Sequence, residues 1–274
     1  MSARTSLEKY AASGHRRVAG WLSQIAVDAT CVLSRQQVSM GMRGGLAEIG
    51  VHHGRFFILL HLLREPGERS AAYDLFEMQS ENVDRSGEGS KSALLANLQR
   101  HADGGADAIT RSRNSLHMTP AEVLNDVGAV RLFSIDGGHT ADITASDLSL
   151  AESAICSGGI VILDDYFNPS WPGVSEGTNR HFSQGSKLVP VCITGNKFVF
   201  TNTQEHAKAY RQALGTMQGA VSEFQEVFGA RVLVLSPQQR SLKQSLAGSS
   251  LWRHMGPTRV GRLAKDVALR ILER

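Results

Sequence analysis

The chain has 274 residues, of which 42% are hydrophobic and 20% are charged, and its formal net charge is +3. This composition is typical of a soluble globular protein and excludes a disordered chain, a collagen-like chain and a coiled coil. The apolar runs are far shorter than the ~20 residues of a membrane-spanning helix. The first thirty residues show no secretory signal, and the three cysteines are dispersed. We therefore expect a protein of the reducing cytoplasm, without a disulfide framework or a zinc site.

Positive charge gathers near both ends of the sequence. Residues 240–274 hold eight Lys or Arg against two acids, and residues 1–20 hold four against one. Basic ends can attract anions, although solvated faces are the commoner explanation. We divide the chain into an N-terminal helical segment (1–40), a large central domain (41–240) and a basic tail (241–274). The first could form a lid or an oligomer contact, and the tail contains an amphipathic helix at 258–273.

Short apolar strands alternate with helices along the central domain. In chain order, the hydrophobic pattern predicts strands at 46–49, 71–76, 106–109, 130–135, 160–163, 188–193, 197–201 and 231–235. The helices between them are expected at 56–63, 88–101, 120–125, 142–156 and 205–228. This alternation predicts an α/β fold, with a mostly parallel sheet that helices cover on both faces.

The first two strands end in residues suited to a nucleotide-like ligand. Ligands of such sheets bind at the carboxyl ends of the strands. The first strand leads into Glu48-Ile-Gly50-Val-His-His-Gly54, whose glycines let the backbone turn tightly beside a ligand. The spacing is not the dinucleotide fingerprint, because the two further glycine positions hold His52 and Arg55. Asp74 follows the second strand and could accept both hydroxyls of a ribose, or simply cap a turn.

Two later strands end in acids. One runs into Asp136-Gly-Gly-His139 and the next into Asp164-Asp165. If these strands are neighbours, three carboxylates converge, and like charges that close must protonate, find cations or bind a metal. An all-oxygen cluster suits Mg²⁺, Mn²⁺ or Ca²⁺. His139 could act as a base near neutral pH.

Taken together and in this order, the motifs resemble those of the class I S-adenosylmethionine-dependent methyltransferases. The nearest branch is that of the small bacterial O-methyltransferases with an acidic metal site, which includes the macrocin-type sugar O-methyltransferases. The resemblance covers about residues 40–205. Besides the segments above, it rests on Tyr73-Asp74-Leu75-Phe76, Asn114-Ser115 and the Gly158-Gly159 strand before Asp164. It implies a Rossmann-like seven-stranded sheet with a reversed last strand.

The resemblance also implies roles for individual residues. S-adenosyl-L-methionine would be bound by Glu48, Gly50, Val51, His52, Gly54, Asp74, Leu75, Phe76, Asn114, Ser115 and Asp136. A divalent cation would be ligated by Asp136, Asp164 and Asp165. The catalytic residues would be His139 and Asp136. The sugar-modifying relatives carry a second acid as base where this chain has Gly138, so we assign the base to His139 instead.

The expected activity is O-methylation of a small-molecule hydroxyl, on a sugar or another natural product. Three alternatives stay open at this stage: a nicotinamide-dependent oxidoreductase on a similar sheet, a nucleic-acid methylase, and a scaffold that binds the cofactor without turnover. The acid cluster and the missing third glycine count against the first. The aromatic content of only 6% counts against a nucleic-acid partner. The loop from Phe167 to Val174 could shape the acceptor pocket or merely connect two elements.

Overall fold

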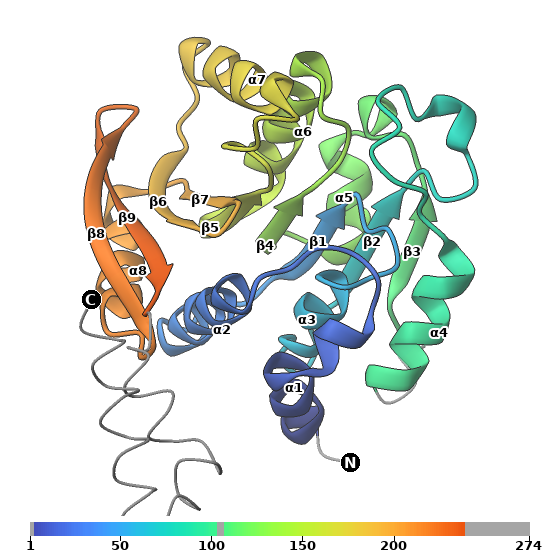
Figure 1. Cartoon of the computed structure of the whole chain (residues 1–274), viewed down its shortest axis with the longest axis horizontal. Helices are drawn as coiled ribbons and strands as arrows, with labels where there is room; N and C mark the ends of the chain where they lie inside the picture. Colours follow the sequence, from blue (N-terminus) through green and yellow to red (C-terminus); the bar gives the residue numbers. More distant parts are fainter. Residues whose placement is uncertain (1–2, 103–106, 239–274) are drawn as a thin grey trace, which may run out of the picture. The chain divides into compact units, whose positions relative to one another are not determined.

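The computed structural model describes residues 3–102 and 107–238 (Figure 1). The chain divides into two compact units, Met1–Ser236 and Pro237–Arg274. Nearly all of the second unit, including the basic tail and the helix predicted at 258–273, lies outside the described residues. Within the described part, no helix is long and apolar enough to cross a membrane.

A nine-stranded sheet with the order β3-β2-β1-β4-β5-β7-β6-β9-β8 forms the centre of the first unit. The strands are β1 (Gly45–Ile49), β2 (Ser70–Asp74), β3 (Ile109–Ser112), β4 (Val130–Ile135), β5 (Ile155–Leu163), β6 (Val189–Thr194), β7 (Lys197–Thr201), β8 (Ala220–Val227) and β9 (Ala230–Pro237). The first five pair in parallel, and β7 runs antiparallel to both β5 and β6. The predicted α/β sheet with a reversed strand is therefore confirmed, but it has nine strands instead of seven.

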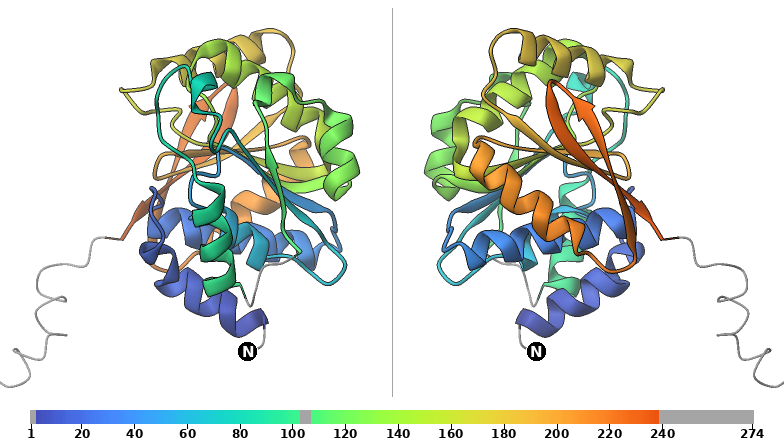
Figure 2. Two further views of the ribbon diagram at one scale, coloured as in Figure 1. Left: turned by 90° about the vertical axis from the view of Figure 1, so that its right-hand side faces the viewer. Right: turned by 90° about the vertical axis from the view of Figure 1, so that its left-hand side faces the viewer.

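Helices cover both faces of this sheet (Figures 1 and 2). One face packs against α1 (Ala3–Ala12), α2 (Gln24–Ser39), α3 (Phe57–Leu62), α4 (Lys91–His101) and α8 (Gln204–Gly215). The other face packs against α5 (Pro120–Val127), α6 (Ala141–Ala154) and α7 (Pro172–Ser183). Three short 3₁₀ turns complete the described elements: η1 (Gly14–Arg17), η2 (Gln79–Glu81) and η3 (Ser115–His117).

The central strands are apolar on both sides because each face has its own core. In β4, Leu132 belongs to the apolar cluster of α2 and α3, whereas Phe133 belongs to that of α5 and α6. Successive side chains of a strand point to opposite faces. A strand buried on both faces therefore reads as a continuous hydrophobic run, and this made the central strands predictable.

The end of the sheet differs from the prediction. The helix expected at 205–228 ends at Gly215, and residues 220–227 form β8 instead. Gly215 and Gly219 interrupt the helical pattern, and Phe228 and Gly229 both adopt positive φ, 52° and 68°. Two such residues form the tight turn that suits a β-hairpin, here between β8 and β9. The predicted helix ran through Gly215 and Gly219, although glycine favours the end of a helix.

A buried ion pair ties the first helices to the sheet. Arg131 of β4 is fully buried, and its Nε donates to Oε1 of Glu68 over 2.8 Å. Its Nη1 donates to Ser34 and Gln37 of α2, and its Nη2 to Glu68 and the Leu63 carbonyl. All five N–H groups of the guanidinium thus have acceptors. Because both charges are buried, loss of one partner would leave the other uncompensated.

We expect Arg131→Met to lower the free energy of unfolding by about 3 kcal/mol or more, because Glu68 would keep a buried charge without its partner. Urea unfolding followed by circular dichroism measures this change. Arg43→Met is the matched control, since Arg43 is exposed and bonds only to the neighbouring Met42 carbonyl. An equal effect of the two substitutions would contradict the structural role of the pair.

Candidate active site

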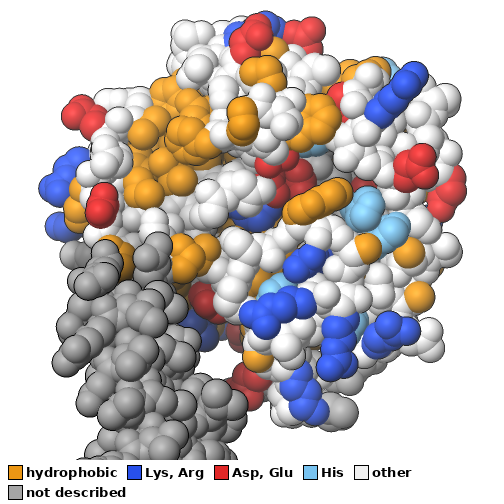
Figure 3. Space-filling model, in the orientation of Figure 1, with side chains coloured by type: hydrophobic (Ala, Val, Ile, Leu, Met, Phe, Trp, Pro, Cys, Tyr) orange, Lys and Arg blue, Asp and Glu red, His pale blue; other side chains and the backbone are white. Residues whose placement is uncertain are grey.

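A cavity of about 630 Å³ opens at the carboxyl ends of β1, β2, β4 and β5. Parallel strands end at the same edge of the sheet, so the residues that follow them converge there. Acidic side chains gather in the middle of the corresponding face, beside histidines and hydrophobic side chains (Figure 3). The loop predicted as a candidate acceptor wall lines this cavity through Phe167, Asn168, Pro169 and Trp171.

The loop after β1 lies tightly against the loop after β4. Gly50 has φ +77°, and a Cβ built there would lie 1.7 Å from the carbonyl oxygen of Asp136. The Asp136 N–H in turn donates to the Ile49 carbonyl over 2.9 Å. Only glycine combines this backbone conformation with so close an approach. The fold itself therefore requires glycine at position 50, the first glycine of the predicted loop.

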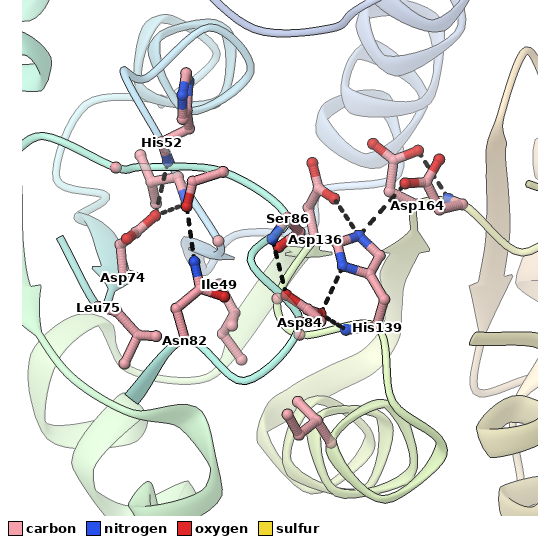
Figure 4. Close-up of a pocket in the computed structure, with 18 of the residues that line it drawn as sticks. Ile49, His52, Asp74, Leu75, Asn82, Asp84, Ser86, Asp136, His139 and Asp164 are labelled. Carbon is pink, nitrogen blue, oxygen red and sulfur yellow. Dashed lines mark hydrogen bonds and ion pairs between the residues drawn. The ribbon is translucent and has the colours of Figure 1, made fainter. Parts of the chain in front are cut away.

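The Asp74 carboxylate holds the glycine loop from below (Figure 4). Its Oδ2 accepts the backbone N–H groups of Val51 and His52, each over 2.7 Å. Its Oδ1 accepts the N–H of Phe76 over 2.7 Å. A carboxylate offers about four acceptor positions, so one is left on Oδ1 for a ligand. Asp74 itself lines the cavity.

Most of the residues expected to bind the cofactor line this cavity. They are Glu48, Gly50, Val51, His52, Asp74, Leu75, Asn114, Ser115 and Asp136. Two expected residues lie behind its wall. A Cβ on Gly54 would come within 2.4 Å of Leu94 Cδ1, and Phe76 is fully buried and contributes its backbone N–H to Asp74.

Glu48 is a buried acid beneath the loop. Its Oε1 accepts the hydroxyl of Ser134 over 3.1 Å, and its Oε2 has no hydrogen-bond partner among residues 3–102 and 107–238. Burial raises its pKa well above the usual range, and the nearby Lys197 only partly opposes this shift. Burial thus favours the protonated form of Glu48, and one of its oxygens is unpaired.

His139 lies between acids from three loops (Figure 4). Its Nδ1 is 3.0 Å from Oδ2 of Asp84, and its Nε2 is 3.4 Å from Oδ2 of Asp165 and 4.0 Å from Oδ1 of Asp136. Its ring stacks on Trp171 at 4.3 Å between centroids. Burial opposes a charge on this ring, but the hydrogen bonds with Asp165 and Asp84 outweigh it and raise the pKa of His139 to about 9.

The structure separates the three acids expected to bind a metal. Asp136 and Asp165 lie with His139, and one donor atom from each of these three residues lies within 4.8 Å of the others. Asp164 instead accepts the ammonium of Lys197, with 2.5 Å between Oδ2 and Nζ, and its Oδ1 accepts the Asp165 N–H over 2.9 Å. One of the three expected ligands, Asp164, is therefore already paired with the positive charge of Lys197.

This arrangement does not suit a divalent cation on the three carboxylates. Asp164 is ion-paired with Lys197, and a metal ion placed on it would stand beside this ammonium. The remaining set, Asp136, His139 and Asp165, includes a histidine whose two ring nitrogens already face Asp84 and Asp165. We therefore derive no chemical step through a metal.

Several residues at the cavity were not predicted as site residues. Trp21 comes from the N-terminal segment, Asp84 from the loop after η2, Arg113 from the end of β3, and Asn196 from the turn before β7. Lys197 lies beneath Asp164 and is almost fully buried. Only Asp84 carried a signal in the sequence, since it belongs to a polar loop after the second strand.

Residues 47–166 match the family model described as a methyltransferase domain. The match covers 120 of the 274 residues. Its fold is similar to that of the O-methyltransferase NovP, with a TM-score of 0.57 at 12% identity over 74% of this chain and 98% of that one. The family match favours methyl transfer over the hydride transfer that the sheet alone left open.

Two further solved structures are more distant. CalS11, a TDP-rhamnose 3'-O-methyltransferase of calicheamicin biosynthesis, has a TM-score of 0.46 and 17% identity, covering 73% of this chain and 93% of that one. An O-methyltransferase from Bacillus cereus in complex with S-adenosylhomocysteine (SAH) has a TM-score of 0.49 and 14% identity, over 72% and 89%. No curated protein matches the chain.

We expect Gly50→Ala to weaken the binding of SAH by roughly tenfold or more, because a left-handed backbone is strained in alanine and the methyl group would displace the Asp136 backbone. Isothermal titration calorimetry measures the affinity. Gly67→Ala is the matched control: Gly67 has φ +86°, but a Cβ there meets nothing within 4 Å. Unchanged affinity in Gly50→Ala would show that this loop does not form the methyltransferase's cofactor site.

Proposed function

We propose that the protein methylates a hydroxyl group of a small molecule, on a sugar or another natural product, with S-adenosyl-L-methionine as methyl donor. The observation that carries the proposal is the Asp84–His139 pair, which directs Nε2 of a histidine toward acids that line the cavity. A hydroxyl needs a base to accept its proton during methyl transfer, and a histidine held by a carboxylate is such a base. The names of NovP and CalS11, both O-methyltransferases, agree with this choice.

The cofactor half of the cavity would be formed by the glycine loop and Asp74. The features that suit the cofactor are the Gly50 backbone, which leaves no room for a side chain, and the unpaired Oε2 of the buried Glu48. Asp74 would offer its free acceptor position to the ribose, while its other hydrogen bonds keep the loop in place. Asn114 and Ser115 would lie against the adenine. When bound, the cofactor supplies a methyl group already activated by a sulfonium.

The chain's own residues would then align the acceptor and take its proton. Phe167 and Trp171 form an apolar wall of the cavity beside His139. An acceptor held against this wall would direct its hydroxyl at Nε2 of His139. Asp84 holds Nδ1 and so fixes the ring and stabilises the imidazolium that forms. Asp136 faces the same position and would orient the hydroxyl. Such alignment is the larger part of what an in-line displacement requires from a protein.

A methyl-transfer assay tests the proposal. The purified full-length chain is incubated with labelled S-adenosyl-L-methionine and a panel of nucleotide sugars, phenols and other hydroxylated natural products, and nuclear magnetic resonance identifies the methylated atom. We expect an O-methyl product, accompanied by one SAH for each methyl transferred. His139→Gln should retain SAH binding and lose at least about 100-fold in kcat, whereas His117→Gln, at an exposed position, should behave as wild type. Methylation of nitrogen, carbon or nucleic acid would contradict the proposal.

The rate should also increase with pH. His139 accepts a proton only in its neutral form, and its pKa is raised to about 9 by Asp165 and Asp84 against the effect of burial. The kcat/KM of the wild type should therefore rise about tenfold per pH unit up to this pKa. In Asp84→Asn one of the stabilising carboxylates is lost, so the midpoint should move to lower pH by about one unit or more. A profile that falls with pH between 6 and 9, or an unmoved midpoint in the variant, would exclude His139 as the base.

A further inference from the structure

Lys197 is a buried cation at the acid cluster that the proposed chemistry has not used. Its exposed fraction is 2%, and that of its partner Asp164 is 5%. The ammonium contacts Asp164 Oδ2 at 2.5 Å and lies 4.6 Å from the centroid of the Phe56 ring. A lysine is almost never fully buried unless it is paired. Its place directly beneath the strand-end acids therefore calls for an explanation.

The fold delivers this lysine to the acids by the reversal of β7. Lys197 is the first residue of β7, and Phe198 pairs with Leu163 at the end of β5. Because β7 is antiparallel to β5, its amino end lies at the edge where β5 ends. The preceding residue binds the second acid of the pair: Asn196 donates from Nδ2 to Asp165 Oδ1 over 3.2 Å, and its carbonyl accepts the Asp165 N–H over 3.1 Å. One turn thus satisfies both members of the Asp164–Asp165 pair.

We propose that Lys197 supplies, from within the chain, the positive charge that a divalent cation supplies at these acids in metal-dependent methyltransferases, so that methyl transfer by this protein requires no metal ion. The inference rests on the proposed O-methyl transfer. Lys197 does not line the cavity and is a positioning residue: it acts through Asp164, which does line it. By neutralising Asp164, the ammonium lowers the net negative charge beside Asp136 and Asp165, where the reacting groups would lie.

The charge balance of the cluster supports this role. Burial alone would lower the pKa of Lys197, but Asp164, Asp136 and Glu48 outweigh it and raise that pKa, so the lysine stays charged. Lys197 pairs with Asp164, and His139 lies between Asp84 and Asp165, so each of the two cations of the cluster already faces carboxylates. A divalent ion added to the same acids would repel the ammonium at short range.

Two measurements on the wild type test the proposal directly. Mn²⁺ titration followed by electron paramagnetic resonance should show no stoichiometric site, and treatment with EDTA should change kcat by less than about twofold, because the charge is built in. SAH binding measured on the same EDTA-treated protein should also be unchanged. Stoichiometric Mn²⁺ binding that is lost in Asp165→Asn would overturn the proposal. The binding measurements need no acceptor, so this result stays distinguishable from a failure of the proposed O-methyl transfer.

The variant Lys197→Met provides the complementary test. Without the ammonium, Asp164 is left as an uncompensated carboxylate beside Asp136 and Asp165, and we expect the variant to gain one Mn²⁺ site and to lose at least about 100-fold in kcat without metal. Added Mn²⁺ should restore part of this loss, which a merely structural role of Lys197 would not predict. Lys187→Met, at an exposed position, should match the wild type throughout. A folded Lys197→Met protein with full metal-free activity would contradict the inference; if this variant does not fold, the wild-type measurements decide.

Discussion

Seven acidic residues line one cavity because the strands and loops that carry them meet at one edge of the sheet, and five of them lie around Lys197 and His139. These five are Glu48, Asp84, Asp136, Asp164 and Asp165. Partly buried carboxyl groups this close cannot all remain ionised without compensation, and the structure provides three kinds of compensation. Lys197 pairs with Asp164, and His139 lies between Asp84 and Asp165. Burial raises the pKa values of Glu48 and Asp136 and so favours their neutral forms, which is the third kind of compensation.

The two cations have different consequences for the chemistry. His139 can release its proton, because its Nε2 faces the cavity and its charge depends on hydrogen bonds with Asp84 and Asp165. Lys197 cannot release its proton as readily, because its ammonium is enclosed by Phe56 on one side and by Asp164 on the other. The cavity floor thus combines a fixed charge with a titratable one.

The sequence predicted those parts of the fold and site that depend on neighbours along the chain. Leu132 and Phe133 lie in a run buried on both faces, so β4 was evident, and Gly50 and Asp74 directly follow strands. Lys197 and Trp21 reach the cavity through pairing and packing between distant segments, which no local pattern records. The separation of Asp164 from Asp136 and Asp165 depends on the same distant lysine. The strand β8 was read as helix because its exposed residues lack the apolar side of a buried strand.

The close packing of Gly50 against Asp136 joins the two halves of the cavity. The loop that would hold the methyl donor follows β1, and the acids and base that would receive the acceptor follow β4 and β5. The Asp136 N–H donates to the Ile49 carbonyl, and the Asp136 carbonyl lies where a Gly50 side chain would be. Asp74 fixes the same loop from the side of β2 through the Val51 and His52 N–H groups. In-line methyl transfer demands alignment of donor and acceptor to within fractions of an ångström. Because backbone atoms set this junction, the alignment depends on the sheet itself more than on any mobile side chain.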